Sequence, residues 1–180
     1  MSYQPELIGG HLLVDLVNTV SWRLDGARRI DRLTTQLDLA DWCAAVGLSP
    51  GDTPLQDVTR LREIAYRVLR PMARGERPAR ADLDALRRLI VEAMTTAQPP
   101  APDLVRLLDW QVDGLVGTLA MAAARLLERA DLTRLRECQD DDCGWLFLDR
   151  SKNGSRRWCS SADCGNRARA KRHYERVRSS

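Results

Sequence analysis

Apolar residues recur at helical spacing through most of residues 1–131. Over residues 11–22 they follow the i, i+3, i+4, i+7 spacing of one helix face. Similar stripes predict helices over residues 35–46, 80–95 and 117–130. The apolar positions of the first helix are Leu13, Leu16, Val17 and Val20. We therefore expect a mainly α fold with a helical N-terminal domain.

A further helix is predicted to begin near Pro54. Asp52 or Thr53 is placed to cap this helix, and Pro54 suits its first turn because proline lacks the N–H that a helix start leaves unpaired. The apolar stripe of this helix runs to Met72. Because a proline inside a helix removes a backbone hydrogen bond, we expect Pro71 to kink or shorten the helix at that point.

Several segments interrupt the helical pattern. A polar, arginine-rich connection covers residues 23–32, and three prolines within residues 98–102 favour an extended loop. Residues 103–111 fit either a helix or a strand. A short capped turn is predicted over residues 131–135, directly before Cys138.

The pattern changes beyond residue 131. Residues 145–148 form a short β-prone run, residues 149–154 contain an Asn-Gly turn signal, and residues 156–158 lead back toward the next cysteine. These features predict a β-hairpin. A helix is predicted over residues 166–178, and we expect its apolar stripe to pack on the hairpin. This stripe consists of Ala170, Tyr174 and Val177.

Four of the five cysteines fall within a short stretch, with four residues inside each close pair and fifteen between the pairs. These four are Cys138, Cys143, Cys159 and Cys164. Two close pairs of thiolates are typical of a tetrahedral Zn²⁺ site, and four sulfur ligands leave no position for a catalytic water. We therefore expect one structural zinc ion in a treble-clef-like finger over residues 132–180. The remaining cysteine, Cys43, is expected to be a buried apolar residue.

The charge is divided unevenly along the chain. The net charge is +3 for the whole chain, +8 for residues 150–180 and −5 for the remainder. A strongly basic end on a mildly acidic body indicates an appendage that binds a polyanion.

The basic residues of the finger are candidates for contacts with double-stranded DNA. Guanidinium groups bind phosphates and the edge of guanine, and a helix fits the major groove. The candidates are these basic residues together with Asn166: Lys152, Arg156, Arg157, Asn166, Arg167, Arg169, Lys171, Arg172, Arg176 and Arg178. A solvated helix or a protein-binding surface is the alternative interpretation.

The first helix offers a candidate site for a small-molecule effector. Asp15, Asn18 and Trp22 are predicted to lie away from its apolar stripe, where polar groups beside an indole can line a pocket. The alternative is that Asp15 and Asn18 hold the helix through buried hydrogen bonds.

Other classes of protein are disfavoured. The two histidines, His11 and His173, lie in no recognisable catalytic or metal motif, and no phosphate-binding glycine loop or nucleophile elbow is present, so we expect no enzymatic activity. No apolar run approaches a membrane span and no secretory signal is visible. We expect a cytoplasmic protein.

The sequence resembles a known family at these same residues. Cys164-Gly165-Asn166-Arg167 is the tetrapeptide that names the CGNR zinc finger, and residues 143–147 and 157–159 resemble its context. Residues 13–19, Leu-Val-Asp-Leu-Val-Asn-Thr, are similar to the opening of the helical ABATE domain. The resemblance implies an ABATE-like domain over residues 1–131, a finger that binds zinc and DNA, and a role in stress-induced transcription.

Two functions follow as hypotheses. The first is a DNA-binding transcription regulator whose helical domain senses a ligand or forms a homodimer, so that two basic helices meet neighbouring half-sites. The second is a zinc-stabilised adaptor whose basic helix binds an acidic protein or RNA. Steep salt dependence and a sequence preference on duplex DNA distinguish the first from the second.

Overall fold

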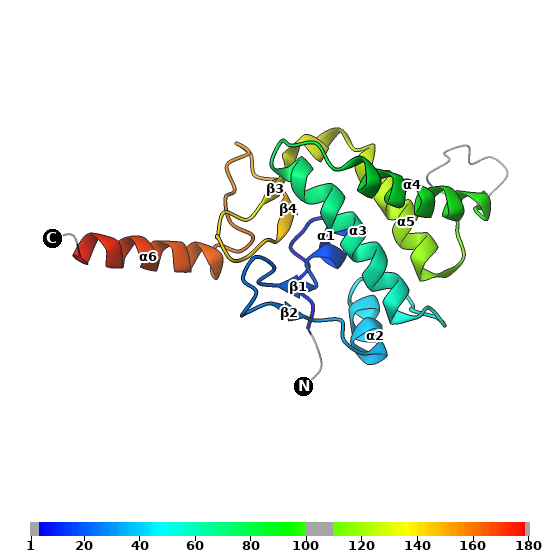
Figure 1. Ribbon diagram of the computed structural model, residues 1–180, viewed down its shortest axis with the longest axis horizontal. Helices are drawn as coiled ribbons and strands as arrows, with labels where there is room; N and C mark the ends of the chain where they lie inside the picture. The colour runs from blue at the N-terminus through cyan, green and yellow to red at the C-terminus, as the bar shows by residue number, and fades with distance from the viewer. Residues whose placement is uncertain (1–3, 100–109, 179–180) are drawn as a thin grey trace.

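Three long helices, α3 (Leu55–Ala73), α4 (Arg80–Thr95) and α5 (Gly114–Leu127), lie against one another on one side of the molecule (Figure 1). The short helix α1 (Leu12–Val17) packs against α3 and α5, and α2 (Gln36–Ala45) lies beside them. This computed structural model describes residues 4–99 and 110–178. Most of the segment 103–111, for which helix and strand were both open, lies outside the described residues.

The periodic segments form helices close to the predicted bounds. α4 covers the predicted residues, and α2 begins with a capping box in which Thr35 Oγ1 accepts from the Asp38 N–H at 3.1 Å and Asp38 accepts from the Thr35 N–H at 2.8 Å. The predicted side-chain cap of α3 is wrong: Pro54 itself is the N-cap residue. α3 continues through Pro71 and ends at Ala73. None of the described helices combines the length and the apolar character needed to cross a membrane.

The first helix is shorter than predicted, because α1 ends at Val17 instead of continuing to Trp22. The chain then forms a small antiparallel hairpin of β1 (Val20–Ser21) and β2 (Ile30–Asp31), in which Val20 pairs with Asp31. Trp22, in the loop of this hairpin, has φ 54°, a left-handed conformation that is unusual for a bulky residue. Strand pairing therefore overrides the helical spacing after Val17.

A second hairpin also differs from the one predicted. β4 (Leu146–Leu148) pairs antiparallel with β3 (Leu135–Glu137), which follows the 3-10 turn η2 (Ala130–Arg134), and not with residues 156–158. The connection between the strands, residues 138–145, is the knuckle that contains the first two cysteines of the cluster. The Cys138 N–H donates to the Trp145 carbonyl at 2.8 Å, which continues the ladder into the knuckle.

Strand β4 joins two hydrophobic clusters. Leu146 and Leu148 belong to the main core with Leu135 and the side chains of α1–α5, whereas Phe147 belongs to the cluster of the four cysteines. This division follows from the alternation of side chains along a strand. Strand β4 therefore packs against the helical domain with one face and against the cysteine cluster of the finger with the other.

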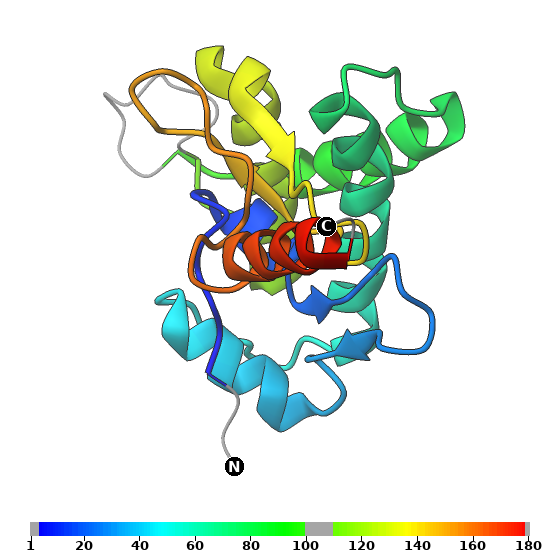
Figure 2. The same cartoon turned by 90° about the vertical axis from the view of Figure 1, so that its left-hand side faces the viewer.

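The last helix, α6 (Cys164–Arg178), projects away from the rest of the molecule (Figure 1), and Figure 2 views this helix nearly end-on. Only Cys164 and Gly165 of this helix are buried. The predicted packing of its apolar stripe on the hairpin is wrong, because Tyr174 is 69% and Val177 62% exposed. Both faces of β4 are already covered, by the helical core and by the cysteine cluster.

Candidate metal centre and nucleic-acid interface

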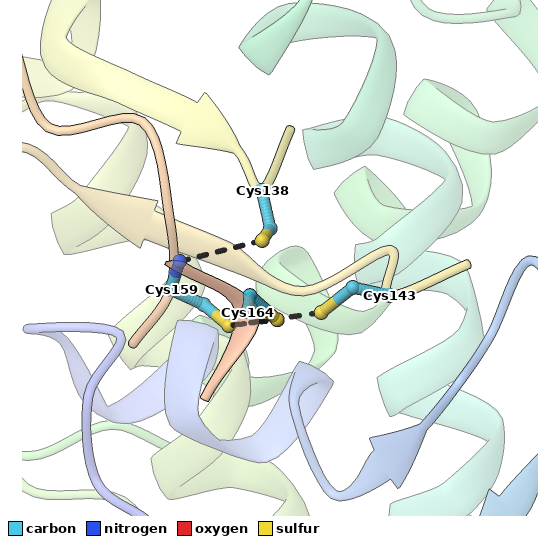
Figure 3. A group of neighbouring side chains, drawn as sticks. All are labelled: Cys138, Cys143, Cys159 and Cys164. Carbon is cyan, nitrogen blue, oxygen red and sulfur yellow. Dashed lines mark hydrogen bonds between the residues drawn. The ribbon is translucent and has the colours of Figure 1, made fainter. Parts of the chain in front are cut away.

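Four cysteine sulfurs converge beside the second hairpin (Figure 3). All four Sγ atoms lie within 4.8 Å of one another, and each side chain is buried. The Sγ of Cys159 lies 3.3 Å from that of Cys164 and 3.7 Å from that of Cys143. Sulfurs at the usual zinc–sulfur distance of about 2.3 Å in a tetrahedron are about 3.8 Å apart. The predicted ligand set is thus gathered in a geometry that suits a zinc ion.

Separate elements deliver the four ligands. Cys138 directly follows β3 at the start of the knuckle, Cys143 lies near the end of the knuckle, Cys159 lies in a bend between β4 and α6, and Cys164 is the first residue of α6. Gly144 has φ 68°, and a Cβ at this position would lie 2.9 Å from the Cβ of Arg23. Glycine is therefore required where the knuckle turns toward β4.

The crowded thiols perturb one another. Hydrogen bonds from the neighbouring thiols hold the pKa of Cys138 far below its usual value, and the shared protons raise the pKa of Cys143 and Cys159. A divalent cation would replace the shared protons and accept all four sulfurs as thiolates. The Cys159 N–H also donates to Cys138 Sγ at 3.4 Å, and Arg167 donates to Cys164 Sγ at 2.8 Å, which are contacts that favour thiolates.

Cys43, the fifth cysteine, belongs to the main core and not to the cluster of the four other cysteines. It is fully buried in the main core beside Trp42, as the sequence predicted. Burial raises the pKa of the Cys43 thiol to about 11, so the side chain is neutral and apolar.

Asn18 connects the helical domain to the finger. Its side-chain amide donates to the Leu146 carbonyl at 2.8 Å, and its Oδ1 accepts from the Leu146 N–H at 2.9 Å. Trp145 adds a bond from its Nε1 to the Val20 carbonyl at 2.8 Å. Asn18 thus bonds to the edge of β4 that faces away from β3, where the Leu148 N–H also donates to the Gly9 carbonyl at 2.9 Å; the contact of Asn18 joins residues 128 positions apart in the sequence.

Asp15 and Trp22, the other two candidates for a ligand pocket, also have partners within the chain. Asp15 Oδ1 accepts from the Gly9 N–H at 2.7 Å, and burial raises the pKa of this carboxyl to about 6. Two guanidinium groups lie over the indole of Trp22, that of Arg28 at 3.6 Å and that of Arg167 at 4.3 Å from the ring centroid. These contacts support the structural alternative, and ligand binding at these residues stays a prediction.

The candidate DNA contacts divide into internal and exposed groups. Arg156 donates to the carbonyls of Trp158 and Cys159 at 3.0 and 2.5 Å, and its guanidinium lies 4.1 Å from the Phe147 ring. Arg167 bonds to Asp140, to Asp163 and to the sulfur of Cys164. These two arginines therefore have structural contacts inside the finger.

The remaining candidates are at the surface. Arg157 donates to Gln139 Oε1 at 2.6 Å, and Asn166 donates to the Ala162 carbonyl at 2.5 Å. The exposed basic residues are Lys152, Arg157, Arg169, Lys171, Arg172, Arg176 and Arg178. Their contact with DNA stays a prediction.

Sequence reasoning missed an acidic surface in the knuckle. Asp140, Asp141 and Asp142 are three consecutive residues between Cys138 and Cys143. Each meets one cation: Asp140 lies 3.1 Å from Arg167, Asp141 3.5 Å from Lys171, and Asp142 3.3 Å from Arg28. A run of three acids between two metal ligands was the available signal, because a knuckle holds such residues on one small surface.

These features define a helical protein whose last strand pair and last helix form a four-cysteine zinc-finger module. Comparison with known families agrees with this class. The chain belongs to the ABATE family, described as "Putative stress-induced transcription regulator", whose model matches residues 10–130. The CGNR zinc finger matches residues 134–177. No curated protein matches the chain.

Proposed function

We propose that this protein is a DNA-binding transcription regulator that presents α6 to duplex DNA. The observation that carries the proposal is the exposure of a basic helix whose first residue, Cys164, is one of the four clustered cysteines. α6 contains six basic residues and one acidic residue, and it has little contact with the rest of the chain beyond its first turn. Such a helix is free to enter a major groove, which is about 12 Å wide.

A structural zinc ion is part of the proposal. It would be held by the four buried cysteines and would fix the start of α6 to the knuckle and to β3. Four sulfur ligands complete a tetrahedral shell, so the ion would have no open position for a substrate or a water nucleophile. The proposed protein is accordingly a non-enzymatic one.

The helical domain would fix the orientation of the finger. Asn18, Trp145 and Trp22 connect the two parts, so the direction of α6 relative to α1 would be set before DNA binds. Preorganisation of this kind lowers the ordering cost of binding. An effector or a homodimer contact on the helical domain would then alter the placement of α6 directly, and both remain part of the proposal.

Selection of duplexes from a random pool by the intact, zinc-loaded protein tests this function. We expect one enriched sequence that binds roughly 1000-fold or more tightly than random duplex at physiological salt. Equal binding of selected and random duplexes would contradict the proposal. In that case, tighter binding to RNA or to an acidic protein would favour the adaptor.

A further inference from the structure

Arg167 contacts both parts of the molecule. Its side-chain nitrogens donate to Asp140 in the knuckle, to Asp163 just before α6, and to the sulfur of Cys164. Its guanidinium carbon also lies over the indole of Trp22, 4.3 Å from the ring centroid. Trp22 belongs to the helical domain, whereas the other three partners belong to the finger. One side chain therefore connects a residue of the cysteine cluster to the helical domain.

Two carboxylates fix the orientation of this guanidinium. Asp140 accepts from Arg167 Nε at 3.2 Å and from Nη2 at 3.1 Å, and Asp163 accepts from Nη1. Nη2 also donates to the Sγ of Cys164 at 2.8 Å. Because the guanidinium is planar and each of its three nitrogens has an acceptor, a donor is held in a fixed direction toward the sulfur.

A donor in this position suits a metal-bound thiolate. Four cysteine thiolates carry more negative charge than one Zn²⁺ neutralises, and hydrogen bonds to the sulfurs stabilise the excess and orient the ligands. The carboxylates of Asp140 and Asp163 would add to this negative charge if no cation lay between them and the sulfur of Cys164. Arg167 supplies that cation and the hydrogen bond together.

The helical domain supports Arg167 through the indole of Trp22. The guanidinium of Arg28 lies over the same ring, 3.6 Å from its centroid. The N–H of Arg23, the residue after Trp22, donates to the Cys143 carbonyl at 3.1 Å, which holds this part of the chain against the knuckle. The cation–π contact with Trp22 therefore comes from a segment that is itself attached to the metal centre.

We infer that Arg167 is a positioning residue of the metal centre, and that it couples the retention of zinc to the contact between the helical domain and the finger. The inference rests on the proposed zinc ion and does not depend on DNA binding. The contacts run from Trp22 to Arg167 to Cys164, so a displacement of Trp22 would weaken the support of one metal ligand. Because coupling between two equilibria is reciprocal, loss of the metal would also weaken the contact between the two parts.

The zinc affinity of the full chain, measured by competition with a chromogenic chelator, tests the inference. Arg167→Leu removes the donor to Cys164 and should weaken zinc binding by roughly 10-fold to 100-fold, the usual cost of losing a partner of a metal ligand. Arg167→Lys keeps the charge without the planar fork, so it should still bind zinc roughly 10-fold more weakly than the wild type.

Arg172→Gln is the matched control on the same helix. Arg172 is exposed, and its Nε donates to the Ala168 carbonyl at 3.2 Å. Its replacement should leave the zinc affinity within about two-fold of the wild type, as expected for a surface substitution.

Trp22→Leu tests the connection to the helical domain while Arg167 stays in place. Loss of the cation–π contact should weaken zinc binding by roughly 3-fold or more. In the double variant of Trp22→Leu with Arg167→Leu, the two losses should not add, because both act through the same guanidinium. Both side chains are partly exposed, and the helicity of each variant measures whether the helical domain is retained.

Cobalt(II) in place of zinc gives a readout that a purely structural role would not change. The charge-transfer band from thiolate to cobalt should move to lower energy in Arg167→Leu, because a sulfur that has lost its hydrogen-bond donor is more electron-rich. The band of Arg172→Gln should coincide with that of the wild type.

Several results would overturn the inference while leaving the zinc site in place. These are wild-type zinc affinity in Arg167→Leu or Trp22→Leu, full recovery by Arg167→Lys, additive losses in the double variant, or an unchanged cobalt band in Arg167→Leu. A wild-type chain that binds no zinc would overturn the proposed metal centre and the inference with it. The zinc affinity of the wild type therefore separates the two failures.

Discussion

The helical body and α6 use arginine in opposite ways. In the body, Arg62 is 2% exposed and donates to the two carboxylate oxygens of Asp31 at 2.7 and 2.5 Å and to Thr19 at 3.1 Å. On α6 the basic residues beyond the first turn are exposed. A buried charge has to be paired for the fold to tolerate it, whereas the fold does not require the five cations that lie beyond the first turn of a projecting helix. The difference indicates that the charge of α6 serves a partner.

Loss of a cysteine ligand is expected to have the largest effect, because it removes the connection between the two regions. Cys159→Ser should release the metal and unfold residues 138–178, since the binding energy of a structural zinc, about 10–16 kcal/mol, is also folding energy. Elemental analysis and circular dichroism measure both losses. Cys43→Ala, in the main core, is the control and should keep one zinc per chain. Full zinc content in Cys159→Ser would refute the ligand set.

Asn18→Ala should weaken the junction of the helical domain and the finger. It leaves the buried N–H and carbonyl of Leu146 without their partner, which should lower the free energy of unfolding by about 2–4 kcal/mol. Urea denaturation measures this change. Asn153→Ala, in the exposed loop after β4, is the matched control and should stay within about 0.5 kcal/mol. Similar losses for both variants would mean that the amide of Asn18 does not support β4.

His11 should make the stability of the body depend on pH. Its Nδ1 accepts from the Leu13 N–H at 3.2 Å, and burial together with the charges of Arg129 and Arg125 lowers its pKa to about 4. Because the folded pKa lies below the unfolded value of about 6.5, the stabilisation is complete above pH 6.5 and is lost as the pH falls toward 4.

The variant His11→Asn keeps an N-cap acceptor that does not titrate. Relative to this variant, the wild type should lose up to about 2 kcal/mol of unfolding free energy between pH 7.5 and pH 5. The raised pKa of Asp15 acts in the opposite direction, but it is present in both proteins and cancels in the difference. A difference that does not change with pH would show that His11 titrates normally.

A substitution on α6 should have the smallest effect on stability. Tyr174→Ser replaces a side chain that is 69% exposed with one of similar helix propensity, so the unfolding free energy should change by less than about 0.5 kcal/mol. Thermal or urea unfolding measures it. Phe147→Ala, in the cysteine cluster, should instead cost about 3–5 kcal/mol. A loss above 1 kcal/mol for Tyr174→Ser would indicate that α6 packs on the body.

The sequence was informative wherever one local rule dominated. Helical spacing located α2, α4 and α5, and the cysteine spacing identified all four sulfurs that cluster. The family resemblance was confirmed over both parts of the chain. Local rules failed where a distant partner decided the outcome, as at Val20, whose helical spacing yields to pairing with Asp31.

The same limit applies to the site. The turn signals predicted that residues 156–158 pair with residues 145–148. In the structure, β4 pairs instead with β3, which precedes it in the sequence. The stacking of Trp22 on Arg167 joins residues from the two ends of the chain, and no local pattern predicts it. The pairing of the acidic knuckle with α6 depends on the fold of the finger for the same reason.

Hydrogen–deuterium exchange of the intact, zinc-loaded protein, with and without duplex DNA, tests the central claim most directly. The amides of a projecting helix exchange through local opening of the helix, and binding of the helix in a DNA groove suppresses that opening. We predict that duplex DNA protects the amides of α6 while those of α3, α4 and α5 change little. Protection confined to the helical body, with α6 exchanging as it does in the free protein, would contradict the account.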